Sequence, residues 1–139
     1  MPELQVKDLM TVGVLTMSPG DSLSDLRDLM YSRHVRHVPV VSAEQQIKGL
    51  VSHRDLLRNT LFDRPRVSQY VEDEILASLT VGEVMTRDVE CVGPDDDLTG
   101  AARLMLDRKF GCLPVIAEGK LVGILTESDF VRLHAADET

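Results

Sequence analysis

Apolar and polar positions follow the same order twice along this chain. In each stretch a short apolar segment, residues 12–17 or 89–92, predicts a strand. The next segment has apolar residues three and four positions apart, which predicts a helix that buries one face. Two further apolar runs predict a pair of strands, and the second run leads directly into another helix. The pattern therefore predicts a mixed α/β (α+β) fold made of two similar units.

The expected bounds of these elements can be read from local signals. The first long helix begins at Ser22, which fits a capping box with Asp25. The strand pairs are expected at 38–41 with 47–51 and at 113–117 with 121–125, and the final helices at 55–62 and 129–134. Residues 117–120 form a short connection with a Gly, which indicates a hairpin. The apolar helix faces consist of Leu23, Leu26, Leu29 and Met30 in the first stretch and Leu98, Ala101, Leu104 and Met105 in the second.

The second stretch is a copy of the first. Val-Lys-Asp-Leu-Met-Thr at 6–11 recurs as Val-Gly-Glu-Val-Met-Thr at 81–86, and Val-Pro-Val at 38–40 recurs as Leu-Pro-Val at 113–115. Gly-Leu-Val-Ser at 49–52 matches Gly-Ile-Leu-Thr at 123–126, and Asp55 matches Asp129. So many matches at a nearly constant offset indicate an internal duplication.

The duplication divides the 139 residues into a first repeat at 1–62, a linker at 63–79 and a second repeat at 80–139. Val71, Ile75 and Leu79 are spaced by four, so the linker is expected to contain a helix. One repeat alone is small for a stable domain, because small domains bury little of their surface. We therefore expect one globular module with internal pseudo-twofold symmetry.

Composition argues against several classes of function. The formal net charge of −8 is opposite to the dense positive surface that sequence-independent nucleic-acid binding requires. Aromatic residues make up 4% and Trp is absent, so no stacking platform for single strands is expected. No apolar run is long enough for a membrane span, and the first residues do not resemble a signal peptide. Cys91 and Cys112 match neither a disulfide framework nor a zinc pattern, which favours a reduced, cytoplasmic protein.

The repeated motifs resemble the paired cystathionine-β-synthase (CBS) domains, also called a Bateman module. They are the opening Val-x-x-[Leu/Val]-Met-Thr, the Val/Leu-Pro-Val strand and the closing Gly-x-x-[Ser/Thr]-x-x-Asp, each present twice in the same order. The resemblance covers residues 6–133 and implies two β-α-β-β-α units packed sheet to sheet. It also implies clefts between the units that bind AMP, ADP, ATP or S-adenosylmethionine, a homodimer, and regulation of an associated enzyme or transporter. The chain then looks like a stand-alone module.

The two closing motifs are the candidate ligand loops, and each has two interpretations. Ser52 with Asp55, and Thr126 with Asp129, fit helix capping boxes, and caps are far commoner than ligand sites. A helix N-terminus also favours phosphate, and an adjacent Asp can accept hydrogen bonds from ribose hydroxyls. The resemblance assigns this ligand role to the hydroxyl and the Asp. The two roles are compatible, so we expect nucleotide contact for at least one motif.

Basic residues are more numerous beside the closing motif of the first repeat than beside that of the second. Those of the first repeat are Arg33, His34, Arg36, His37, His53, Arg54 and Arg58. The equivalent positions around the second motif are less basic, and they are Arg108, Lys109, Phe110, Gly111, Cys112, Glu127 and Ser128. Arg suits phosphate oxygens because its donors form a planar fork. We therefore expect a polyphosphate at the Ser52/Asp55 site and a less charged ligand, or none, at the Thr126/Asp129 site. For any single basic residue a solvated surface position remains the simpler interpretation.

The resemblance also implies which residues form the walls around a purine. They are Val14 and Thr16 with Val89 and Cys91, the stretches His37-Val38-Pro39 and Cys112-Leu113-Pro114, and the flanking Arg36, Arg54 and Gly111. Ordinary core packing explains the Val and Leu residues almost as well, and both cysteines fit small buried apolar residues. Three of the four histidines lie between residues 34 and 53, but no clustered Cys, Asp or Glu completes a metal site.

Three classes of function can be distinguished from the residues. The first is a non-catalytic regulatory module that senses an adenosine-type ligand, and the second is an interaction or dimerisation scaffold that binds no ligand. The third is an enzyme, but the sequence has no Walker-type Gly-Lys-Ser/Thr loop, no G-x-S-x-G elbow and no zinc-hydrolase pattern. We therefore expect the first function, with no catalytic residue, no catalytic cofactor and no metal.

Overall fold

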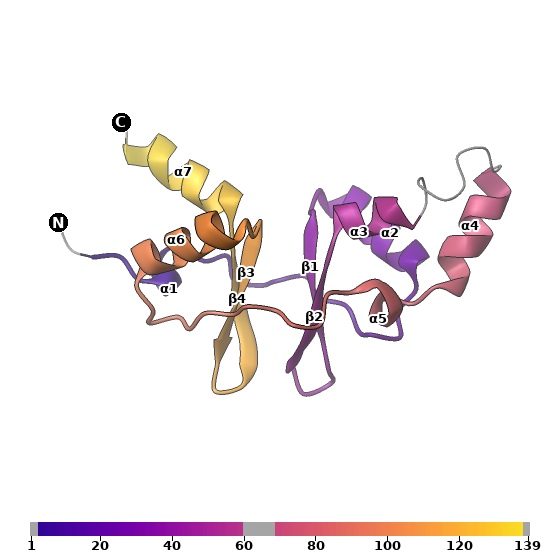
Figure 1. Ribbon diagram of the computed structural model, residues 1–139, viewed down its shortest axis with the longest axis horizontal. Helices are drawn as coiled ribbons and strands as arrows, with labels where there is room; N and C mark the ends of the chain where they lie inside the picture. Colours follow the sequence, from indigo (N-terminus) through magenta and orange to yellow (C-terminus); the bar gives the residue numbers. More distant parts are fainter. Residues whose placement is uncertain (1–2, 60–68, 138–139) are drawn as a thin grey trace. The chain divides into compact units, whose positions relative to one another are not determined.

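The computed structural model describes residues 3–59 and 69–137, and the chain folds as two compact units (Figure 1). One unit comprises residues 15–88 and is called here the Asp55 unit. The other comprises residues 1–14 together with 89–139 and is called the Asp129 unit. Both contain helices and a two-stranded sheet, which confirms the predicted mixed α/β class.

The Asp55 unit is built around an antiparallel hairpin. Strand β1 (His37–Val41) pairs with β2 (Ile47–Ser52), with His37 opposite Ser52. The helices lie on one side of this hairpin in Figure 1. They are α2 (Leu23–Arg33), α3 (His53–Arg58), α4 (Gln69–Ser78) and the one-turn α5 (Val81–Val84). Helix α4 confirms the helix expected in the linker, of which residues 63–68 lie outside the described part.

The Asp129 unit repeats this plan. Strand β3 (Cys112–Ala117) pairs antiparallel with β4 (Lys120–Thr126), with Cys112 opposite Thr126. The one-turn α1 (Val6–Leu9), α6 (Leu98–Arg108) and α7 (Glu127–Asp137) lie on one side of the hairpin in Figure 1. The turn between the strands places Glu118 and Gly119 at φ 53° and 78°, as a two-residue hairpin requires.

The apolar helix faces form a separate core in each unit. Leu23, Leu26 and Met30 of α2 pack with Val38, Val40 and Val51 of the first hairpin. Their counterparts Leu98, Ala101 and Met105 of α6 pack with Leu113, Val115 and Leu125. The predicted helix faces are therefore confirmed, because residues three and four apart on a helix share one side.

The strands predicted at 12–17 and 89–92 are not regular strands. Each is reduced to a single parallel bridge, from Met17 to Val40 in one unit and from Val92 to Val115 in the other. The Met17 N–H donates to the Pro39 carbonyl at 3.1 Å, so the segment still runs along the edge of β1. Apolar composition alone does not separate such an extended edge from a paired strand.

The compact units differ in extent from the sequence repeats at 1–62 and 80–139. Val6 at the start of the first repeat is fully buried in the Asp129 unit, and its N–H donates to the Asp96 carbonyl at 2.9 Å. Val81 at the start of the second repeat is buried in the Asp55 unit, and its N–H donates to the Asp21 carbonyl at 2.7 Å. Each unit thus contains the opening segment of the other repeat.

Within residues 3–59 and 69–137, no helix has both the length and the apolar character needed to cross a bilayer.

Candidate functional site

Ser52 and Asp55 join the end of β2 to the start of α3. The Ser52 N–H and hydroxyl both donate to Asp55 Oδ2, at 2.8 and 3.0 Å. The Asp55 N–H donates in return to Ser52 Oγ at 3.2 Å. This reciprocal pair is a capping box, so the structural role predicted for the motif is confirmed.

The Asp55 carboxylate retains one oxygen for a further partner. Oδ2 receives both bonds from Ser52, whereas Oδ1 receives none from the residues that the structure describes. An ionised carboxylate can accept about four hydrogen bonds, and the Asp55 side chain is only half-buried. Oδ1 can therefore accept a hydrogen bond from a hydroxyl group of a bound molecule.

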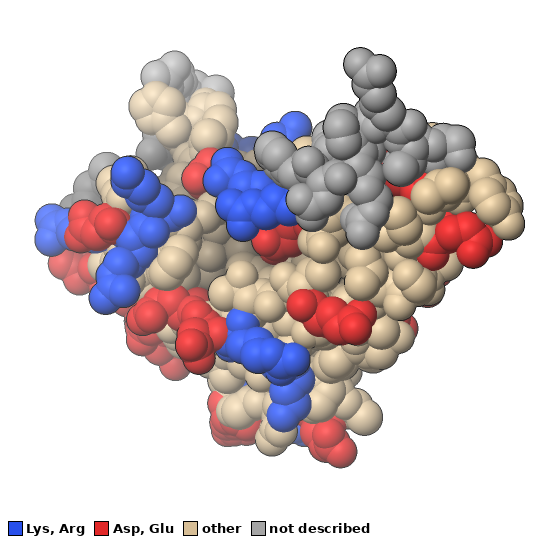
Figure 2. Space-filling model, turned by 45° about the vertical axis from the view of Figure 1, so that its right-hand side comes forward, with Lys and Arg blue, Asp and Glu red and all other residues tan. Residues whose placement is uncertain are grey.

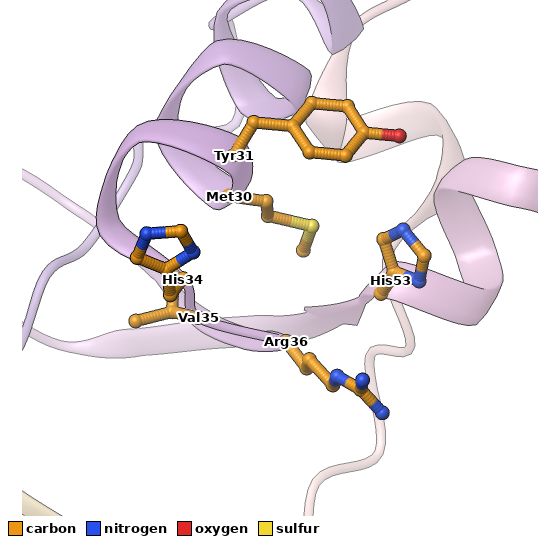
Figure 3. A pocket seen from close by; sticks show the side chains of 6 residues that line it. All are labelled: Met30, Tyr31, His34, Val35, Arg36 and His53. Atoms are coloured by element: carbon orange, nitrogen blue, oxygen red, sulfur yellow. The ribbon is translucent and has the colours of Figure 1, made fainter.

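A pocket of about 300 Å³ lies where the end of α2 meets the start of α3, and its lining includes His53, the residue that follows Ser52 (Figure 3). Figure 3 shows the Met30 side chain in the middle of the pocket, with His34 on one side of it and His53 on the other. The Tyr31 and His53 rings meet edge to face, with their centroids 6.3 Å apart. The six lining residues are Met30, Tyr31, His34, Val35, Arg36 and His53.

Local backbone geometry brings the basic residues to this pocket. Helix α2 ends at Arg33, and the next residue, His34, has a left-handed φ of 55° that turns the chain toward β1. The His53 N–H then donates to the Arg36 carbonyl at 2.8 Å, which joins the start of α3 to the start of β1. Within the described residues, the side chains of His34, Arg36 and His53 have no hydrogen bond or ion pair. These three side chains are called here the basic rim. On a chain with a net charge of −8, they offer a local group of hydrogen-bond donors to an anion.

The equivalent carboxylate in the Asp129 unit is buried and has more partners. Asp129 is 1% exposed. The Thr126 N–H and hydroxyl donate to Oδ2 at 2.8 and 3.2 Å, as in the other capping box. The Thr11 hydroxyl donates to Oδ1 at 3.0 Å, and the Arg132 guanidinium also pairs with Oδ1. All acceptor positions of Asp129 are therefore used within the chain.

The basic rim is only partly repeated around Asp129, where Lys109 follows α6 at the position that His34 has after α2. Glu127 occupies the first position of α7, where α3 has His53. Gly111 precedes β3 at the position that Arg36 has before β1. These differences remove one imidazole and one guanidinium and add a carboxylate, so the Asp129 unit is the poorer site for an anion.

Of the remaining predicted site residues, some are buried in the hairpins and the others are divided between the two units. Val38, Pro39, Leu113 and Pro114 are buried in the hairpins, and Val38 and Leu113 are core residues, as the simpler interpretation held. Val14, Val89 and Cys91 belong to the Asp129 unit, whereas Thr16, His37 and Arg54 belong to the Asp55 unit. Val14 and Thr16, taken together from the sequence, thus lie on different units.

Both cysteines have raised thiol pKa values. Burial, with a smaller contribution from the Glu127 charge, raises the pKa of Cys112 to about 12. Burial and the nearby Glu90 also raise the pKa of Cys91. Because the thiolate is the reactive form, both side chains are poor nucleophiles and behave as small apolar residues.

Sequence reasoning missed part of the pocket and one partner of Asp129. Met30 had been assigned only to the apolar helix face, and Tyr31 and Val35 had no assigned role. Helical spacing offers a signal, because Met30 and His34 are four positions apart and share one side of the helix end. Thr11 carried no signal, because its contact with Asp129 depends on the exchange of opening segments.

The face drawn in Figure 2 and the described metal-binding residue types indicate no competing site. On the face drawn in Figure 2, acidic and basic side chains are interspersed, and neither sign covers a continuous area. No group of three or more His, Cys, Asp or Glu side chains within residues 3–59 and 69–137 is placed to hold a metal ion.

The family model of the CBS domain matches the sequence twice, at residues 6–61 and 81–136. The chain belongs to the CBS domain family. The two matches make it a tandem CBS pair, and they coincide with the duplication found in the sequence. The predicted resemblance is therefore confirmed.

Two solved structures are similar to nearly the whole chain. AcuB from Vibrio cholerae is 36% identical with a TM-score of 0.82, and the match covers 98% of this chain and 95% of that one. CBSX2 from Arabidopsis thaliana, solved in complex with AMP, is 30% identical with a TM-score of 0.82, and the match covers 97% and 99% of the two chains.

The curated relatives differ in the share of their own length that this chain covers. The CBS domain-containing protein YhcV of Bacillus subtilis is 30% identical over 96% of this chain and 88% of its own length. The chain spans only 43% of the uncharacterized protein MJ1225 of Methanocaldococcus jannaschii, which is 31% identical. It spans about a quarter of two matching homoserine O-acetyltransferases.

Proposed function

We propose that this CBS pair is a non-catalytic regulatory module that binds an adenosine-type ligand. The observation that carries the proposal is the Asp55 carboxylate, which is fixed by Ser52 yet keeps Oδ1 for another donor. A ribose hydroxyl is such a donor. The AMP complex of CBSX2, at 30% identity, supports an adenosine compound as the ligand class.

We propose that the ligand is an adenosine compound that carries phosphate groups. His34, Arg36 and His53 line the pocket at the start of α3, and Arg36 provides a forked donor for phosphate oxygens. The pocket volume of about 300 Å³ is at the lower end of the range for small-molecule sites, and it is large enough for phosphate groups. AMP, ADP and ATP are therefore preferred over S-adenosylmethionine, whose sulfonium end is cationic.

Regulation in this proposal works through contacts of the whole module. A ligand shifts the balance between two states only if it binds one of them better. We propose that the shift is transmitted to the other copy of a homodimer, or to an associated enzyme or transporter, in a cytoplasmic setting.

The proposal is tested by thermal denaturation of the protein with AMP, ADP, ATP, S-adenosylmethionine and NAD, followed by calorimetry. A ligand at 100 times its Kd adds about 2.7 kcal/mol of stability, which raises Tm by several degrees in a chain of this size. The shift should be lost in Asp55→Ala. Asp25→Ala is the matched control, because Asp25 has the same third position in α2, a different helix from the one that begins with the pocket residue His53.

The possible results separate the candidate functions. A Tm shift with one or more nucleotides that disappears in Asp55→Ala supports the sensor. An unchanged Tm with every compound contradicts it and favours a scaffold that binds no ligand. Turnover of any nucleotide during the incubation contradicts a non-catalytic role.

A further inference from the structure

The two CBS repeats carry the same three residue types around their closing Asp. Thr11, Asp129 and Arg132 in the Asp129 unit are equivalent by repeat to Thr86, Asp55 and Arg58 in the Asp55 unit. Both threonines also form the same backbone bridge. Thr11 exchanges hydrogen bonds with Ile124 at 2.8 and 3.0 Å, and Thr86 exchanges them with Leu50 at 2.9 Å in both directions.

The side chains of the two sets are used differently. Thr11 and Arg132 both bond to Asp129 Oδ1, and the carboxylate is 1% exposed. Within the described residues, neither Thr86 nor Arg58 bonds to Asp55, whose side chain is half-buried. One carboxylate is therefore enclosed by its own chain, and the other retains a free oxygen.

We infer that Asp129 is a clamp for the N-terminal segment and that the chain binds one adenosine-type ligand, at Asp55. A ligand hydroxyl at Asp129 would have to displace Thr11 or Arg132, and it would have to approach a buried carboxylate beside Glu127. Displacing bonds to a buried charge is costly unless every bond is replaced. No such displacement is needed at Asp55 Oδ1.

The clamp also has a structural consequence. Residues 3–11 precede the rest of the Asp129 unit by about eighty positions in sequence, so their attachment closes a long loop. The Thr11–Asp129 bond adds a side-chain attachment to the backbone bridge at Ile124. Asp129 therefore contributes to the stability of the unit rather than to ligand affinity.

The first experiment compares two isosteric variants without any ligand. Thr11→Val removes the hydroxyl bonded to Asp129, and Thr86→Val makes the same change at the equivalent position with no such bond. We expect Tm to fall by roughly 3–5 °C in Thr11→Val and by less than about 2 °C in Thr86→Val. Equal effects of the two substitutions would overturn the clamp.

The second experiment counts sites by calorimetric titration of the full chain with AMP, and it rests on the proposed function. We expect one AMP per chain, an affinity at least about tenfold weaker in Asp55→Asn, and an affinity within about threefold of the parent in Asp129→Asn. Two AMP per chain, or a similar loss in both variants, would overturn the single-site inference. No heat with AMP would contradict the proposed function and the ligand count, while the comparison of Thr11→Val with Thr86→Val would still decide the clamp.

Discussion

The Arg27 guanidinium donates to Asp73 Oδ1 at 2.8 Å and attaches α4 to α2. Gln69 Nε2 donates to the same oxygen at 2.9 Å, so Asp73 receives bonds from both helices. These two bonds, chiefly the one from Arg27, lower the pKa of Asp73 below its ordinary value. The segment between the two CBS repeats is therefore held to the Asp55 unit by a charged contact as well as by Leu76 in its core.

Replacement of Asp73 by Asn should make the free energy of unfolding less dependent on pH in the acid range. A carboxyl group with a lowered folded pKa stabilises the fold above its unfolded pKa, and this contribution is lost as pH falls through the folded pKa. We expect Asp73→Asn to be less stable than the parent protein at pH 7, with the difference disappearing as the pH falls through the lowered folded pKa of Asp73. Urea denaturation between pH 7 and pH 2.5 measures this. Asp28→Asn is the control, because Asp28 lies on α2 and contacts Arg27 at the longer distance of 3.6 Å.

Gly49 should not accept even a methyl group. A Cβ at this position would lie 2.6 Å from Met85 Sδ and 2.8 Å from the Thr86 carbonyl oxygen. The sulfur can move, but the carbonyl belongs to the backbone bridge with Leu50. We expect Gly49→Ala to lower the free energy of unfolding by about 1–3 kcal/mol, as overpacking does.

Gly20→Ala is the matched control for this variant. A Cβ there has no heavy atom within 4 Å, so the free energy of unfolding should change by less than about 0.5 kcal/mol. Urea denaturation of both variants at one pH gives the comparison. Similar losses in the two variants would show that the close approach at Met85 is not the cause.

The two cysteines should differ in their rates of alkylation. At a pKa of about 12, on the order of one Cys112 thiol in ten thousand is ionised at pH 8, and the side chain is buried. Cys91 is only partly buried, so iodoacetamide should modify it first. Peptide mass spectrometry after timed labelling measures both rates, and labelling in urea provides the control. Equal rates in the folded protein would contradict the burial of Cys112.

Local features of this fold were predictable because they depend on neighbouring residues. The spacing of Leu23, Leu26 and Met30 predicts the buried face of α2, and Ser52 with Asp55 predicts the cap of α3. Both follow from helix geometry, whatever packs against the helix. The repeated motifs likewise identified the CBS family, because they recur within the sequence itself.

Features that depend on distant segments were not predictable in the same way. The opening motifs at 6–11 and 81–86 are so similar that nothing in them shows which unit each joins. The difference between Asp55 and Asp129 has the same origin, because both have a Thr and an Arg at equivalent positions. Only the folded arrangement shows that Thr11 reaches its carboxylate, whereas Thr86 makes no hydrogen bond to Asp55 in the described structure.

Arg36 should determine how strongly the protein prefers longer phosphate chains. It lines the pocket at the start of α3, and its guanidinium can contact phosphate oxygens but has no role in holding a ribose at Asp55. We expect Arg36→Gln to weaken ATP binding about tenfold and adenosine binding by less than about twofold, since hydrogen bonds to charged groups are the stronger ones. Arg33→Gln is the control, because Arg33 is an exposed arginine at the end of α2 that does not line the pocket. Calorimetry with ATP and adenosine on the parent and both variants measures the ratio of the two affinities. An equal loss for ATP and adenosine would show that Arg36 supports the fold of the site rather than the phosphates.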